Sequence, residues 1–103
     1  MTYFIYILEC VNGSYYTGYT TDMTRRYQEH VKGTSKCKYT RSFPPRQIAA
    51  CWEFSVELSD ILKIERFIKA LSKKDKSAII AEPLILISMV QTKLFSQKNR
   101  ELL

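Results

Sequence analysis

The residue types in this sequence that could perform chemistry are tyrosine, arginine, histidine and glutamate. Residues 16–30, YTGYTTDMTRRYQEH, join a tyrosine-rich run to a helix-like segment that carries Arg26 and His30. One interpretation is a strand, a turn and an amphipathic helix. The other is one reactive site, because phenol, guanidinium and imidazole groups together donate hydrogen bonds, carry positive charge and transfer protons.

The first predicted helix places two of these groups close to the protein core. At about 100° per residue, Met23, Tyr27 and Val31 form its apolar stripe, and Arg26 and His30 lie together along one edge of that stripe. A solvated basic face would place them opposite the stripe. The alternatives are a boundary arginine that extends toward solvent beside a hydrogen-bonded histidine, or two members of a catalytic site.

A glutamate in the next long helix is the second unusual feature. Residues 57–71, ELSDILKIERFIKAL, predict a helix with Glu65 in the middle of its core-facing stripe. The apolar members of that stripe are predicted to be Leu58, Ile61, Leu62 and Ile68. A buried carboxylate needs a cation, a hydrogen-bonded arginine or a raised pKa. Glu65 therefore either pairs with a basic side chain such as Arg26 or holds a divalent metal through oxygen.

The elements that must position these residues follow from local patterns. Residues 3–10 and 15–20 read as two strands joined at the turn signal Asn12-Gly13, which can bring Tyr6 and Tyr16 near each other across an antiparallel pair. Thr21 or Asp22 is the predicted cap of the first helix, and Gly33 its stop. A basic loop, a strand at residues 47–54, two helices and a tail follow, which predicts a small α/β domain of the α+β type. For residues 84–90 the pattern leaves helix and strand open.

Size and charge limit the class of protein. A chain of 103 residues with 46% hydrophobic and 25% charged side chains predicts one ordinary globular domain. The net charge of +6 makes nucleic acid the first expected partner, ahead of an anionic membrane surface. The longest apolar stretch contains Glu82 and Pro83 and is too short to cross a bilayer, so no membrane-spanning segment is expected, and nucleic acid rather than a membrane is the expected partner.

The cysteines indicate the cellular compartment. Cys10, Cys37 and Cys51 are odd in number and far apart, which argues against a disulfide framework and against a zinc site. Cys10 and Cys51 lie in strand-like runs and are predicted to be small core residues. Free thiols, together with an N-terminus that does not resemble a signal peptide, predict a reducing, cytoplasmic location.

Taken together, these residues resemble the GIY-YIG nuclease superfamily. The two signature tripeptides are represented by Phe4-Ile5-Tyr6 and Tyr16-Thr17-Gly18. The family's later functional positions match Arg26, His30 and Glu65 in order and spacing. The similarity is closest to small stand-alone bacterial members, which share the YILEC, YTG and RR runs and a KYTR loop at residues 38–41. The resemblance spans about residues 3–80, which suggests a nuclease-like domain at 1–82 and a C-terminal extension of unknown role at 83–103.

The resemblance implies a central three-stranded antiparallel sheet flanked by helices, and single-metal hydrolysis of phosphodiester bonds in DNA. It implies that Tyr6 acts as general base, with Tyr16 orienting the water or the phosphate, although the family offers grounds for either tyrosine. Arg26 would stabilise the charge of the phosphorane and His30 would hold the attacking group or the phosphate. Glu65 would hold Mg²⁺ or Mn²⁺.

Four cations near the KYTR loop are expected to bind backbone phosphates without regard to sequence: Lys36, Lys38, Arg41 and Arg46. Tyr19 stands where several members of the family that the sequence resembles carry a lysine that could lower a tyrosine pKa, and this sequence has no such cation at that position. A bare module of this size is expected to cut weakly or to need a partner. The alternative is a binding module for nucleic acid, DNA before RNA, that has lost catalysis. A separate prediction is a homodimer or protein-partner interface formed by residues 84–95.

Overall fold

The strand nearest the N-terminus is the centre of a three-stranded antiparallel sheet. The computed structural model describes residues 1–95, and within them the strands are β1 (Thr2–Cys10), β2 (Tyr15–Thr20) and β3 (Pro45–Ser55), in the order β2-β1-β3. The apolar run of β1 is buried on both faces, as a central strand requires. The predicted fold class is confirmed.

The β1–β2 hairpin turns at the predicted dipeptide. Gly13 has φ 83°, a left-handed conformation that glycine adopts at little cost, and its amide donates to the Cys10 carbonyl at 2.9 Å. The resulting register pairs Tyr6 with Gly18 and Leu8 with Tyr16. The two tyrosines therefore lie diagonally across neighbouring strands on one face of the sheet.

Local capping chemistry sets the helix boundaries. The described helices are α1 (Met23–Lys32), α2 (Lys38–Ser42), α3 (Leu58–Ala70), α4 (Lys73–Ala81) and α5 (Leu84–Lys93). The Asp22 side chain accepts the Arg25 amide at 3.0 Å, and Gly33 ends α1 at φ 67°. Ser72 caps α4 by accepting the Asp75 amide at 3.1 Å.

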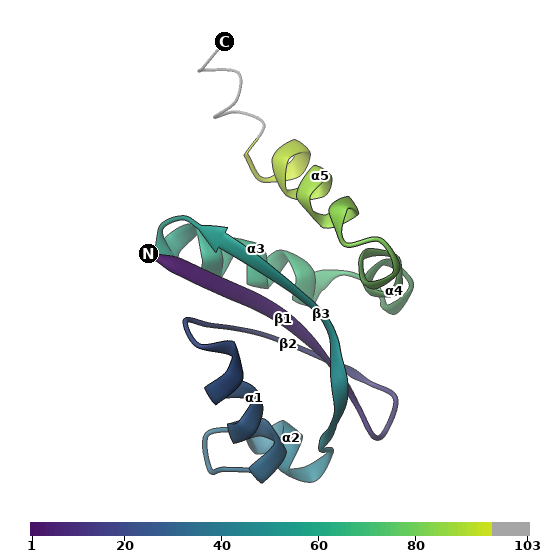
Figure 1. The fold of residues 1–103 in the computed structure, drawn as a ribbon. Helices are drawn as coiled ribbons and strands as arrows, with labels where there is room; N and C mark the ends of the chain where they lie inside the picture. The colour runs from purple at the N-terminus through teal and green to yellow at the C-terminus, as the bar shows by residue number, and fades with distance from the viewer. Residues whose placement is uncertain (96–103) are drawn as a thin grey trace.

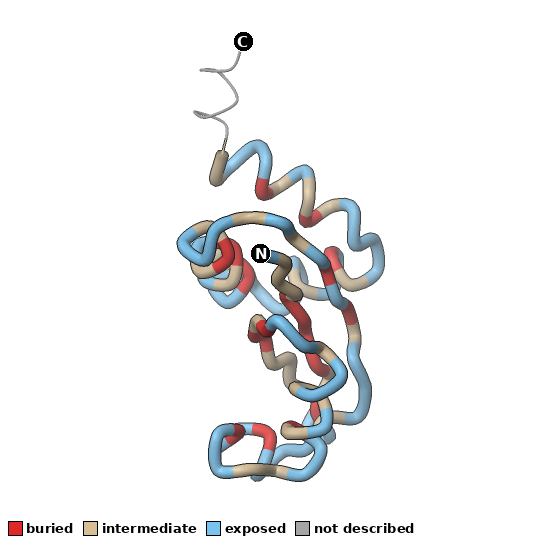
Figure 2. Tube along the Cα trace, turned by 60° about the vertical axis from the view of Figure 1, so that its left-hand side comes forward, coloured by how far each residue is buried: buried red, intermediate tan, exposed pale blue. Residues whose placement is uncertain are grey.

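The sheet separates the two groups of helices, as Figures 1 and 2 show. The main apolar core lies between the sheet and α3, α4 and α5, and Ile5 and Ile7 of β1 point into it. The opposite face of β1 carries Tyr6, which contacts α1. Cys10 is buried as predicted, whereas Cys51 is exposed. Cys51 follows Ala50 and precedes Trp52, which alternate into the core, so its own side chain points outward.

Both predicted helical stripes need correction. In α3 the buried residues are Ile61, Ile64 and Ile68, whereas Leu58 is exposed. The stripe is thus rotated toward Ile64, and Glu65 lies at its edge instead of its middle. In α1 the fully buried residue is His30, and the neighbouring Val31 is 48% exposed.

The segment after Pro83 forms a helix. Leu86 and Val90 of α5 belong to the core cluster, and the indole N–H of Trp52 donates to the Pro83 carbonyl at 2.9 Å. Leu84 remains 80% exposed. The division of the chain at residue 82 stays a prediction, and residues 96–103 of the predicted extension lie outside the described residues. None of the helices in the described part has both the length and the apolar character needed to traverse a bilayer.

Thr17, in the second signature tripeptide, offers a test of the packing of β2. Its side chain is buried and, among the described residues, its hydroxyl has no hydrogen-bond partner. A buried unsatisfied hydroxyl destabilises the fold, so Thr17→Val, of similar shape, should raise the free energy of unfolding by about 1 kcal/mol. Urea denaturation of the two proteins measures the difference. A loss of stability in the variant would mean that the hydroxyl is satisfied in solution.

Candidate active site

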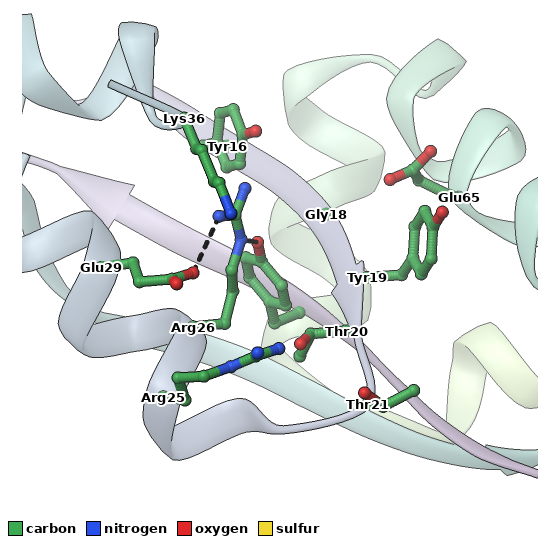
Figure 3. Close-up of a pocket in the computed structure, with 11 residues that line it drawn as sticks. Tyr16, Gly18, Tyr19, Thr20, Thr21, Arg25, Arg26, Glu29, Lys36 and Glu65 are labelled. Atoms are coloured by element: carbon green, nitrogen blue, oxygen red, sulfur yellow. Dashed lines mark hydrogen bonds and ion pairs between the residues drawn. The ribbon is translucent and has the colours of Figure 1, made fainter. Parts of the chain in front are cut away.

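A cavity of about 420 Å³ opens at the edge of the sheet formed by β2. Side chains from both strands of the hairpin, from α1, from the segment that follows it and from α3 line this cavity (Figure 3). The aromatic and charged lining residues are Tyr6, Tyr16, Tyr19, Arg25, Arg26, Glu29, Lys36 and Glu65. Because β2 is an edge strand, a residue of α3 reaches this cavity from the side of the sheet opposite to α1.

The Tyr6 side chain has room beside β2 because residue 18 is a glycine. A Cβ atom at Gly18 would lie 2.5 Å from the Tyr6 hydroxyl oxygen and 2.7 Å from its Cζ. No ordinary contact is that short, so any side chain at this position would displace the Tyr6 ring. Gly18 has no left-handed φ, and its role is to make room.

Tyr6 begins a chain of buried hydrogen bonds. Its hydroxyl lies 2.8 Å from His30 Nε2, and His30 Nδ1 lies 2.7 Å from the Thr40 hydroxyl. Thr40 donates in turn to the carbonyl of Cys37 at 3.4 Å. With that proton in use, Thr40 accepts from the His30 Nδ1–H. Nε2 is then the unprotonated nitrogen and accepts the Tyr6 O–H.

Arg26 places its positively charged guanidinium beside the Tyr6 hydroxyl. Its Nε donates to the Tyr6 oxygen at 3.4 Å, and its Nη1 lies 3.0 Å from Glu29 Oε1. This bond, more than any other contact, lowers the pKa of Glu29. Arg26 therefore does not form the predicted structural pair with Glu65, whose partner at 3.7 Å is the exposed Lys69.

Burial sets the protonation states of this chain. Desolvation raises the pKa of Tyr6 to about 12, against the opposing effect of Arg26. Desolvation, followed by the charge of Arg26, lowers the pKa of His30 to about 4. Burial also raises the pKa of Tyr16. At neutral pH the site thus holds a protonated phenol, a neutral imidazole and a cationic guanidinium.

His30 should make the stability of the fold depend on acidity. Its pKa falls from 6.5 in the unfolded chain to about 4 in the fold. The unfolded state therefore binds more protons between these values, and the free energy of unfolding should fall by up to about 3 kcal/mol as the pH decreases from 7 to 4. Denaturant titrations at both pH values measure this fall.

The matched control for this prediction is His30→Gln, which keeps polar atoms but does not titrate. It should lose the part of the pH dependence due to the imidazole and keep the part due to carboxylates such as Glu29. An identical dependence in both proteins would contradict the assigned shift.

The predicted phosphate-binding cations fall into two groups. Lys36 lines the cavity, and Lys38 and Arg41 are exposed residues of α2. Arg46 lies apart, at the start of β3, where it donates to the Val11 carbonyl at 3.4 Å. Of the four predicted cations, only Lys36 therefore lines the cavity. Lys38 and Arg41 lie in the next helix of the chain, α2.

Comparisons with known proteins show which family the chain belongs to. The GIY-YIG catalytic domain family matches residues 2–78. The chain belongs to this family. The UPF0213 protein BH0048 of Halalkalibacterium halodurans is 40% identical over 81 residues, covering 79% of this chain and 84% of the relative. The UPF0213 protein VNG_2274C of Halobacterium salinarum is 41% identical over 75 residues, covering 73% and 95%.

A solved structure agrees with the fold. The solution NMR structure of the UPF0213 protein BH0048 from Bacillus halodurans has a TM-score of 0.51 and 35% sequence identity, and it covers 87% of this chain and 97% of its own. The predicted resemblance to the small stand-alone GIY-YIG members is thus confirmed. Membership of the GIY-YIG family implies a nuclease-type activity that acts on nucleic acid and generally depends on a divalent metal.

The donor atoms in the GIY-YIG site suit a hard cation with few protein ligands. Glu65 lines the cavity with a side chain that is 17% exposed, and residues 1–95 contain no cluster of three or more His, Cys, Asp or Glu side chains. Mg²⁺ is commonly bound by one or two carboxylates together with waters and substrate phosphates. A single, largely buried carboxylate at the wall of the cavity fits that pattern.

Reasoning from sequence missed two residues of this GIY-YIG site. Thr40 holds His30, and Glu29 holds Arg26. Glu29 carries a detectable signal, because it lies three residues after Arg26 on one helix. Thr40 carries almost none, because its contact with His30 depends on how α2 folds back onto α1.

Proposed function

We propose that this protein is a divalent-metal-dependent endonuclease that hydrolyses phosphodiester bonds in branched, damaged or single-stranded DNA, such as repair intermediates. The observation that best supports this function is that Tyr6, Tyr16, Arg26 and Glu65 all line one cavity. They come from four elements on both sides of the sheet, and together they offer a proton relay, an anion-binding cation and a metal ligand. Free thiols favour a cytoplasmic location.

Tyr6 receives the proton of the attacking water in this proposal. Its oxygen accepts the water proton while its own O–H proton moves to His30 Nε2, the acceptor 2.8 Å away. Thr40 accepts a hydrogen bond from His30 Nδ1–H, so that Nδ1 keeps its proton and Nε2 stays unprotonated and able to accept the proton of Tyr6. A bound phosphate would offset the charge of Arg26, which is one of the two causes of the low pKa of His30, and would make the imidazole a better base.

Arg26 stabilises the negative charge that develops on the phosphorane, because its guanidinium is already fixed by Tyr6 and Glu29 and needs little reorganisation. Tyr16 orients the water or the phosphate from the cavity wall. Glu65 would hold Mg²⁺ or Mn²⁺, which polarises a phosphoryl oxygen and assists the leaving group. Lys36, Lys38, Arg41 and Arg46 bind backbone phosphates. A weak intrinsic activity would be raised by a partner or second copy that binds through residues 84–95.

The test is a cleavage assay on branched, flapped and single-stranded DNA with Mg²⁺ or Mn²⁺. Wild-type protein should nick at least one substrate, and Glu65→Gln should remove that activity while it keeps the circular dichroism and unfolding midpoint of the wild type. Lys69→Gln, which removes the partner of Glu65 at 3.7 Å, is the matched control and should retain activity. Absence of cleavage in both metals for every substrate would end the proposal.

A second candidate is a binding module for DNA or RNA that has lost catalysis. The pKa of Tyr6, which burial raises, is the observation that favours it. Such a module would bind nucleic acid in a salt-dependent way that Glu65→Gln leaves unchanged and that charge reversal at Lys36, Lys38 and Arg41 weakens. The two candidates therefore differ in their response to metal and to Glu65.

A further inference from the structure

Three aromatic rings form a continuous row from the cavity to the surface of α2. The Tyr39 ring is stacked on Tyr16, with centroids 5.9 Å apart and planes inclined by 20°. Phe43, four residues later, contacts Tyr39 at a centroid distance of 5.4 Å. Because Tyr16 also lines the cavity, this row, here called the aromatic shelf, begins at the candidate active site.

The outer part of the shelf is open to solvent yet held in place. Tyr39 is 38% exposed and Phe43 is 39% exposed. The Tyr39 hydroxyl is 2.5 Å from Ser14 Oγ and 3.3 Å from Asn12 Nδ2, in the β1–β2 turn. A ring that is already ordered loses little conformational freedom when a ligand stacks on it.

The charge around the shelf selects for an anionic ligand. Residues 31–46 contain no aspartate or glutamate. The cations of this segment are Lys32, Lys36, Lys38, Arg41 and Arg46. Lys36 lines the cavity, and Lys38 is adjacent to Tyr39 in the chain. Partly exposed aromatic side chains among lysines and arginines are the combination that binds unpaired bases and their phosphates.

We infer that the aromatic shelf binds unpaired bases of a single strand, and so directs single-stranded segments to the cavity. The inference rests on the proposed function and names its substrate class. A base can stack on Phe43, the outer ring of the shelf, only if a face of the base is free, and within a duplex both faces of each base are covered by neighbouring pairs. The shelf therefore distinguishes single strands and flaps from intact duplex, a distinction that phosphate contacts alone cannot make.

Equilibrium binding without metal tests this inference. The probes are a fluorescent single-stranded DNA of about 12 nucleotides, within the range of known site sizes, and the duplex of the same sequence. Both are titrated with the full-length Glu65→Gln protein, so that cleavage cannot interfere. Adding Phe43→Ala should weaken binding of the single strand about 10-fold and of the duplex less than 2-fold. Phe43→Trp should restore single-strand binding.

Two matched controls distinguish the contribution of base stacking to binding from that of positive charge and from that of exposed apolar surface. Lys38→Ala should weaken both probes and reduce the salt dependence, whereas Phe43→Ala should leave the salt dependence unchanged. Leu84→Ala, at an exposed apolar side chain of α5, should change neither affinity.

Equal weakening of both probes by Phe43→Ala, or no weakening, would overturn the inference. A change in sedimentation of the protein alone, without a change in DNA affinity, would also overturn it and would indicate a protein interface. The readout is binding in the absence of metal, so a lack of cleavage by the wild type would count against the proposed function and leave this result standing.

Discussion

Tyr6→Phe should lower metal-dependent DNA cleavage by about 100- to 10,000-fold, the range by which general acid–base catalysis contributes to enzyme rates. The substitution removes one oxygen atom that both donates to His30 Nε2 and accepts from Arg26 Nε. The ring remains, so the 1% exposed site should stay filled. Single-turnover cleavage rates at saturating protein measure the chemical step without contribution from binding.

The controls for Tyr6→Phe are the two other tyrosines of the cavity. Tyr19→Phe should reduce the rate by less than Tyr6→Phe, because the Tyr19 side chain lies on the other side of β2 from Arg26 and takes no part in the proton chain of Tyr6 (Figure 3). Tyr16→Phe should reduce the rate by less than Tyr6→Phe if Tyr16 only orients the water. A reversed order, with Tyr16→Phe the more harmful, would assign the general base to Tyr16.

The sequence predicts those features of the fold that depend on neighbouring residues. Asp22 caps α1, Gly33 ends it and Ser72 caps α4 because each acts on backbone groups only a few residues away. The Asn12-Gly13 turn likewise follows from local conformational preference. The hairpin in turn fixes which face carries Tyr6.

The orientation of His30 could not be predicted in the same way. Hydrophobicity favours Val31 over His30 for the core side of α1, but the structure buries His30 completely and exposes Val31. Burial of the imidazole is tolerated because Tyr6 and Thr40, which come from two other elements, bind both of its nitrogens. These hydrogen bonds join His30 to residues 24 and 10 positions away in the sequence. The periodic pattern of a single helix therefore cannot predict them.

Gly18→Ala should damage both the fold and the proposed catalysis. The added methyl carbon would lie 2.5 Å from the Tyr6 hydroxyl, which is fixed by hydrogen bonds to His30 and Arg26. Overpacking of this kind typically costs about 1–3 kcal/mol. Any displacement of Tyr6 that relieves it also lengthens the bond to His30, so cleavage should fall by at least about 10-fold beyond the loss of folded protein.

Gly13→Ala is the matched control for this prediction. Gly13 has φ 83°, so alanine there strains the backbone, but no atom lies within 4 Å of the added carbon. It should lower the free energy of unfolding by about 1 kcal/mol and leave the cleavage rate of the folded protein unchanged. The comparison separates general destabilisation from displacement of Tyr6.

A double-mutant cycle locates the clash on the Tyr6 hydroxyl. In a Tyr6→Phe background the nearest contact at 2.5 Å disappears and only the ring carbon contacts, at 2.7 Å and beyond, remain. The destabilisation caused by Gly18→Ala should therefore be smaller in that background, by about 0.5 kcal/mol or more in urea denaturation. Additive losses would mean that the hydroxyl does not carry the clash and that the ring carbons of residue 6, which remain in phenylalanine, account for the destabilisation.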